Sequence, residues 1–244
     1  MSREASFQEL LGASFEYHTE NFYTCIPAVV VTVRDNFNQL SIDAQPSINI
    51  KSRDGSIKER AVILNVPVQM PSSSTAAVIV PLNVGDPVML IFSMRGLDTW
   101  KRGNGRPTTP SDYRKFDKRD AIAIPGVMPF GNSTNDPAKH VWTHNPKDLT
   151  IVQNLGSGQE VEIRLKTDGS VAINTTQKVE IQCDQAIVNA NTSIELNSPA
   201  ISFNGNVTHV GNYDMTGTFT LNGVNVNTHI HNGDSGGVTG GPHN

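Results

Sequence analysis

The C-terminal part of the chain is a series of short runs of alternating apolar and polar residues. Apolar positions recur at steps of 10, 8, 8, 7, 7 and 6 residues, with Asn, Gly, Thr or Asp at the junctions, which is a weak repeat of strand plus turn. The positions that mark the repeat are Val161, Val171, Val179, Ile187, Ile194, Ile201 and Val207. Each run offers two or three apolar side chains, so a single chain that wound up such strands would bury little.

Three intertwined chains remove this difficulty. Each short strand then forms one side of a triangular prism, the apolar side chains meet at the axis, and the strands bond to neighbouring chains, so few edges stay open. We therefore predict a trimeric β-helix needle over residues 149–223. A single-chain β-solenoid, which usually has coils of about 20 or more residues, and a disordered tail are the alternatives.

Residues 224–244 are predicted to form a metal-binding tip. If residues 224–231 are extended, His229 and His231 point to one side. Three copies supply six imidazole nitrogens, an octahedral set suited to a divalent transition metal. Two exposed histidines at a mobile end are the alternative. We expect His209 to pack in or on the needle and His243 to be an ordinary terminal residue.

The N-terminal half has the pattern of a small β-barrel. Segment 1–23 is predicted to contain a helix, with Ser6 as N-cap and Glu9 completing a capping box. Apolar and β-branched runs then predict a small β-barrel or sandwich over residues 24–130, and the family resemblance described below implies that it is OB-fold-like. These runs lie at residues 26–33, 39–44, 61–67, 76–81, 88–92 and 121–124. Residues 93–119 are expected to form a long loop, and residues 131–148 a connector.

Charge and composition exclude several classes of protein. Residues 149–244 carry a net charge of −5, which argues against nucleic-acid binding. The basic cluster from Arg114 to Arg119 is interleaved with aspartates and is expected to be a solvated loop. No apolar stretch reaches the length of a membrane helix, and no signal peptide is visible. Cys25 and Cys183 are predicted to be buried thiols.

The sequence offers little for catalysis, and we predict that the protein is not an enzyme. The segment from Asp234 to Gly237 matches a serine-protease nucleophile motif, but the cores that would carry the other catalytic residues are absent. Glu160 and Glu162 are expected to face solvent together rather than form an acid–base pair. His140 and His144 are expected to belong to a packed connector, with a metal or sugar site as the alternative.

The chain resembles the central baseplate spikes, or membrane-puncturing devices, of contractile-tailed bacteriophages. The likeness rests on the barrel segments GDPVMLIF (85–92) and DAIAIPG (120–126), and on THIHNGD (228–234). It implies an oligonucleotide/oligosaccharide-binding-type barrel that trimerises and docks to the tail hub, followed by a β-helix needle. It also implies one iron ion per trimer, held by six histidine nitrogens from His229 and His231 of three chains. The connector is too short for the lysozyme-like domain of some related spikes.

From this resemblance we expect a structural homotrimer at the baseplate tip of the virion. Its partners would be the baseplate hub protein and, transiently, the host outer membrane, which it would puncture during tail contraction. A receptor- or polysaccharide-binding tail protein is one alternative. The spike of a contractile secretion or injection system is another.

Overall fold

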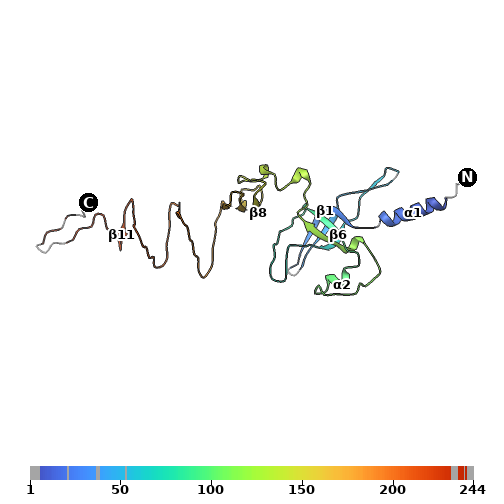
Figure 1. The fold of residues 1–244 in the computed structure, drawn as a ribbon, viewed down its shortest axis with the longest axis horizontal. Helices are drawn as coiled ribbons and strands as arrows, with labels where there is room; N and C mark the ends of the chain where they lie inside the picture. Colours follow the sequence, from blue (N-terminus) through green and yellow to red (C-terminus); the bar gives the residue numbers. More distant parts are fainter. Residues whose placement is uncertain are drawn as a thin grey trace. The chain divides into compact units, whose positions relative to one another are not determined.

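The computed structural model describes residues 6–20, 22–36, 39–52, 54–231, 236–238 and 240. The chain divides into two compact units, Met1–Glu180 and Ile181–Asn244. Figure 1 labels their elements along the chain. None of the helices among the described residues has the length and apolarity needed to cross a bilayer.

The first element is helix α1 (Phe7–Glu20). Its predicted capping box is present, because the Ser6 backbone N–H donates to Glu9 Oε2 at 2.7 Å and the Glu9 N–H donates to Ser6 Oγ at 3.3 Å. The apolar side chains Phe7, Leu11 and Phe15 recur every four residues and are exposed. The helix thus carries an apolar stripe that is not buried within the chain.

A five-stranded antiparallel sheet follows, in the order β5-β2-β1-β6-β7. Its strands are β1 (Cys25–Asn36), β2 (Gln39–Pro46), β5 (Ile63–Pro67), β6 (Pro87–Phe92) and β7 (Ala121–Pro125). A two-stranded hairpin of β3 (Ile50–Lys51) and β4 (Ile57–Lys58) lies between β2 and β5 in the sequence.

The five-stranded sheet curls so that its two edges approach each other. Val68, just beyond β5, forms a parallel bridge with Ala123 of β7, and the Gln69 N–H donates to the Ala123 carbonyl at 2.9 Å. The pairing register shifts between Val30 and Thr32, an irregularity of the kind that bends strands. The result is a half-barrel. It is consistent with the predicted all-β class, and the OB topology stays a prediction.

The core lies inside this half-barrel and follows the alternation of its strands. Along β6, Val88, Leu90 and Phe92 point inward, and they meet Ile42 of β2 and other small or β-branched residues. The remaining core residues are Ala28, Val30, Ala44, Ile63, Val66, Ala121 and Ala123. Ile42 and Leu90 are 0% exposed, and burial of each such side chain contributes about 1.5–3 kcal/mol.

The strand predicted at residues 76–81 is not present. Ser72 and Ala77 form an isolated bridge, and Val78 and Ile79 are exposed. The β-branched composition is strand-like, but the segment has no long partner strand within the chain. The turn after it contains Gly85 at φ +97°, a left-handed conformation that favours glycine.

Residues 93–119 form mainly a loop, with the short helix α2 (Asp98–Lys101) and the start of the 3₁₀ helix η1 (Lys118–Asp120). The prediction of a solvated basic cluster is wrong for Arg114. Its guanidinium donates to the buried Asp120 at 2.7 and 2.8 Å, and also to Asp98 and Asp112, both at 2.6 Å. Asp112 and Asp120 converge with Asp98 on this one guanidinium, whereas Asp117 pairs with the exposed Arg119.

The exposed cysteines are a second correction. Cys25 and Cys183 are both exposed rather than buried. Side chains alternate along β1, and those of Ala28 and Val30 point into the core. Cys25 is an odd number of residues from both, so its side chain points away from the core. Cys183 lies in a tail segment that forms no core within the chain.

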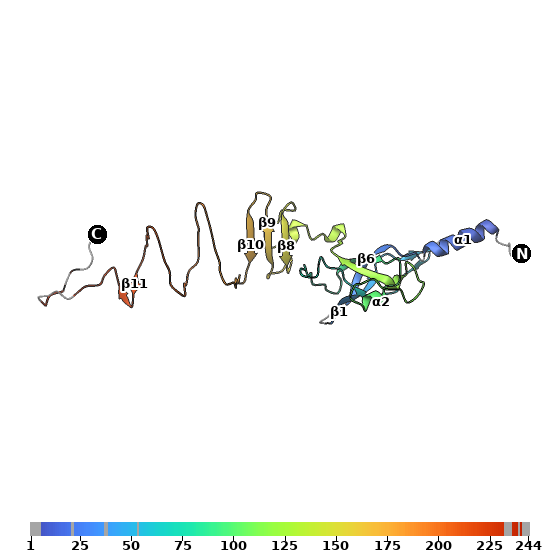
Figure 2. The same cartoon turned by 60° about the horizontal axis from the view of Figure 1, so that its bottom comes forward.

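The connector contains the 3₁₀ helices η2 (Phe130–Asn132) and η3 (Pro137–Lys139) and leads into a three-stranded antiparallel sheet. The strands are β8 (Leu149–Gln153), β9 (Val161–Leu165) and β10 (Val171–Thr175), with β9 in the middle, as Figure 2 shows. The alternating runs at 161–165 and 171–173 are therefore strands, as predicted.

In the second unit, the paired strands of the described part are β11 (Thr220–Leu221) and β12 (Val224–Asn225). The preceding runs, up to residue 219, turn back and forth without pairing with one another (Figures 1 and 2). No backbone–backbone hydrogen bond links the described residues 181–218 to one another. The strands predicted there thus have no partner among the described residues of one chain, and the β-helix stays a prediction.

Candidate metal and assembly sites

One face of the three-stranded sheet is apolar and exposed. The register aligns Leu149, Leu165 and Val171 in one row across the strands. Ile151, Ile163 and Ile173 form a second row. These six side chains, here called the apolar face, are 44–67% exposed. Such a patch on a small sheet indicates an interaction surface.

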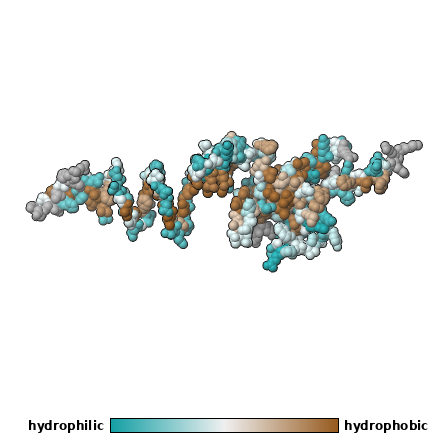
Figure 3. Space-filling model, viewed as in Figure 1, coloured by the Kyte–Doolittle hydropathy of each residue, from teal (hydrophilic) through white to brown (hydrophobic). Residues whose placement is uncertain are grey.

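The tail continues this exposure of apolar residues. Figure 3 shows apolar side chains along the tail, interspersed with polar ones. Those at the repeat positions are at least half exposed: Val179, Ile187, Ile194, Ile201 and Val207. A chain of this composition does not bury its own apolar side chains, which agrees with the argument from the repeat.

The opposite face of the three-stranded sheet is polar and buried. Glu160, Glu162 and Arg164 lie on this face of β9 or just before it, and all are buried. The expectation that the two glutamates face solvent is wrong. The connector covers them: the Val141 N–H donates to Glu160, and the Thr143 carbonyl accepts from Arg164 Nη1.

Glu162 is held by a cation and an amide. Arg164 Nη2 lies 2.6 and 2.8 Å from its two carboxylate oxygens, and Asn174 Nδ2 donates to it at 2.7 Å. Burial raises the pKa of Glu162, but the hydrogen bonds from Arg164 and Asn174 outweigh it, so the pKa lies below its ordinary value. Glu162 is therefore a carboxylate in the folded chain.

Glu160 is held by backbone amides. The Gly156 N–H donates to Oε2 at 2.6 Å, and the Val141 N–H lies 3.3 and 3.2 Å from the two oxygens. Gly156 has φ +72°, and a Cβ there would lie 2.8 Å from the Lys139 carbonyl oxygen. A glycine is thus required where the connector crosses this turn.

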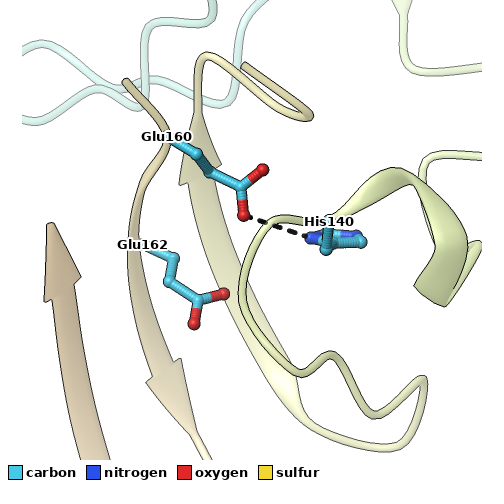
Figure 4. A group of neighbouring side chains, drawn as sticks. All are labelled: His140, Glu160 and Glu162. Atoms are coloured by element: carbon cyan, nitrogen blue, oxygen red, sulfur yellow. Dashed lines mark ion pairs between the residues drawn. The ribbon is translucent and has the colours of Figure 1, made fainter. Parts of the chain in front are cut away.

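His140 and His144 belong to a packed connector, as predicted. Their rings stack with centroids 3.8 Å apart and planes within 3°. The His140 side chain is 1% exposed, and its Nδ1 lies 3.8 Å from Glu160 Oε1. Figure 4 shows both carboxylates directed toward the side on which the His140 ring lies. Ligand atoms of His140, Glu160 and Glu162 all lie within 4.8 Å of one another.

At the predicted tip, a tight hairpin precedes the two histidines. Asn222 and Gly223, both with positive φ, form the two-residue turn between β11 and β12. Residues 224–231 are not fully extended, because β12 ends at Asn225 and a turn occupies residues 226–228. The alternation argument therefore does not describe this segment.

The structure nevertheless places His229 and His231 side by side. Their ring centroids are 4.8 Å apart with an interplanar angle of 84°. His229 Nδ1 lies 2.8 Å from the Val226 carbonyl, so Nδ1 carries the proton and Nε2 offers the lone pair. A ligating histidine usually has its other nitrogen fixed in this way.

The remaining candidates from the sequence are placed as follows. His209 is exposed and packs locally, with Nε2 3.0 Å from the Asn212 carbonyl and its ring edge-on to Tyr213. His243 and the protease-like Asp234-Ser235 lie outside the described residues.

Residues 26–126 match a protein-family model described as the phage protein Gp138 N-terminal domain. The match begins within β1 and ends just after β7, so it spans the five-stranded sheet. It supports the prediction of a phage protein. No curated protein matches the chain.

Proposed function

We propose that this chain is the non-enzymatic spike of a contractile phage tail. The half-barrel that carries the family match would hold the spike on the baseplate hub. The needle built from residues 149–223, with its tip at 224–244, would be driven through the host outer membrane when the sheath contracts. The protein would thus be a virion component at the baseplate tip.

The observation that carries the proposal is the arrangement of the three-stranded sheet. Its charged side chains are buried and its six apolar residues are exposed. In a monomeric antiparallel sheet the apolar face is normally buried and the polar face is solvated. Three copies could bring their apolar faces together around one axis. Burying these half-exposed side chains would contribute on the order of 5–10 kcal/mol per chain, before the entropy of association.

The tail supports the same assembly. Ordering the described residues 181–218 costs about 1–2 kcal/mol of backbone entropy per residue, and no internal backbone hydrogen bonds or core offset it. Strands donated by neighbouring chains would pair these backbone groups and bury the repeat positions. An interlocked trimer of this kind would resist forced unfolding, a property set by the unfolding rate.

The tip residues fit a metal ion shared by three chains. Iron coordinated by imidazole nitrogens from all three chains would hold their C-terminal tips together. In each chain, the hydrogen bond from His229 Nδ1 to the Val226 carbonyl fixes the ring and directs Nε2 outward as a ligand.

Light scattering and metal analysis by mass spectrometry on the purified full chain test this proposal. A solution mass three times that of the 26.4 kDa chain, with one iron per three chains, is the expected result. A folded protein with the mass of one chain would overturn the spike proposal.

A further inference from the structure

The buried cluster beneath the connector lacks one positive charge. It contains two carboxylates, Glu160 and Glu162, and the Arg164 guanidinium pairs with Glu162. Among the described residues, no lysine or arginine forms an ion pair with Glu160, whose side chain is 0% exposed. Backbone amides solvate this carboxylate but do not neutralise it. Buried carboxylates in proteins are usually paired with a cation or coordinate a metal ion.

His140 points an unpartnered nitrogen at this charge. Its Nε2 lies 3.0 Å from the Thr134 carbonyl, which only accepts hydrogen bonds, so Nε2 carries the proton. Its Nδ1 is buried, has no hydrogen-bond partner and faces Glu160 Oε1. In the neutral ring this places a nitrogen lone pair opposite a carboxylate oxygen, an arrangement that invites a cation between them.

We propose that His140, Glu160 and Glu162 bind one divalent transition-metal ion per chain, at the base of the needle. Imidazole nitrogen and carboxylate oxygen are both zinc ligands, and zinc sites with three protein ligands keep an open fourth position. His140 Nδ1 and a Glu160 oxygen would bind the ion, and Glu162 would supply a third ligand oxygen. Arg164 and Asn174 fix the orientation of the Glu162 carboxylate. The ion would fasten the connector to β9.

The distance between His140 Nδ1 and Glu160 Oε1 favours a metal ion over a proton. A hydrogen bond from Nδ1 to a carboxylate oxygen takes about 2.7–3.2 Å, and the two atoms are 3.8 Å apart. A zinc ion bonded to both atoms at about 2.0–2.2 Å would fit between them, with a bent N–Zn–O angle, at their present separation.

The test uses the full chain carrying His229→Ala and His231→Ala, so that the tip takes no metal. After removal of bound metal with a chelator, titration calorimetry with ZnCl₂ should show one Zn²⁺ per chain. Adding His140→Ala or Glu160→Gln to this background should weaken binding by more than tenfold. His209→Ala, which removes an exposed histidine from the tail, is the matched control and should leave binding unchanged.

X-ray absorption of the zinc-loaded background chain gives a second readout that needs no substitution at the site. One imidazole per zinc, with nitrogen and oxygen neighbours at about 2.0–2.2 Å, is expected. No binding in the background chain, or binding that His140→Ala leaves intact, would overturn the proposal. Because this ion is counted per chain and outside the tip, its absence leaves the spike proposal standing.

Discussion

Arg114 joins three carboxylates from the loop between β6 and β7. Asp120, the most buried of them, also accepts the Leu97 N–H at 2.8 Å, so the guanidinium fixes the path of the loop. We predict that Arg114→Met lowers the free energy of unfolding by about 3–5 kcal/mol, because it leaves Asp120 buried and unpaired. Thermal unfolding of the full chain, followed by circular dichroism, measures this loss.

Arg119→Met is the matched control for that substitution. Arg119 pairs with Asp117, but its side chain is 62% exposed, and exposed pairs contribute about 0–1 kcal/mol. Equal losses in the two variants would contradict the role assigned to the buried pair.

The buried carboxylate of Asp120 makes the stability of the fold depend on pH. Burial raises the pKa of Asp120, but hydrogen bonds from Arg114 and the Leu97 N–H outweigh it and hold the pKa below its ordinary value of 3.8. A lowered folded-state pKa contributes stability above the unfolded pKa, and the contribution is lost as the pH falls through the folded value. The unfolding temperature should therefore drop below about pH 4. Asp120→Asn should show a smaller drop over that range, and an unchanged drop would count against this assignment.

Local sequence predicted some side-chain roles and missed others. The Ser6–Glu9 capping box was predictable because both partners lie within one helical turn. The burial of Glu160 and Glu162 was not, because it depends on residues 140–144 crossing the strand from about twenty positions away. A charged run at i, i+2 and i+4, beginning just before β9, was the available signal, since it places Glu160, Glu162 and Arg164 on one face.

Leucines on the two faces of the half-barrel sheet differ in burial. Leu90 of β6 is fully buried, and Leu64 of β5 is 62% exposed. We predict that Leu90→Ala costs about 2–5 kcal/mol through lost burial and the cavity left behind, and that Leu64→Ala costs much less. Thermal or urea unfolding of the two variants compares them directly. Similar losses would mean that the inward face of the sheet is assigned wrongly.

The apolar face of β8, β9 and β10 is predicted to hold the trimer together. Ile163 lies in the central strand, so Ile163→Asp would place a charge from each chain at the proposed axis. We expect the solution mass measured by light scattering to fall from three chains toward one. Ile57→Asp, at an exposed isoleucine of β4, is the control and should stay trimeric. A trimeric Ile163→Asp protein would exclude this face from the interface.

The alternation of apolar and polar residues predicted strands correctly only where a partner strand lies in the same chain. The runs in β9 and β10 pair with each other and were predicted, whereas the similar runs around Ile187, Ile194 and Ile201 have no partner strand in the part of the chain that the structure describes. Residues 76–81 show the same limit in the first unit. Composition reports the preference for extended backbone, but pairing depends on which other strand is present.

The proposed spike would have two kinds of fastening along its length. Chain interlocking in the needle would distribute load over many strand pairs, whereas the metal at the tip would act at one point. A separate ion under each connector would fix the needle's first strands to the segment that leaves the half-barrel. Glu162 of the buried cluster and Ile163 of the apolar face are adjacent in β9, so substitutions at these two sites are not expected to add.

Removing the tip ligands tests which fastening holds the assembly. We predict that the His229→Ala and His231→Ala double variant loses the proposed tip iron but remains a trimer. Each chain still contributes the six residues of the apolar face and the repeat positions of the tail, a far larger contact than two imidazoles. Metal analysis and light scattering on the same sample measure both outcomes, with His209→Ala as the control that keeps the iron. A monomeric double variant would show that the metal, and not the intertwined strands, is the main bond between the chains.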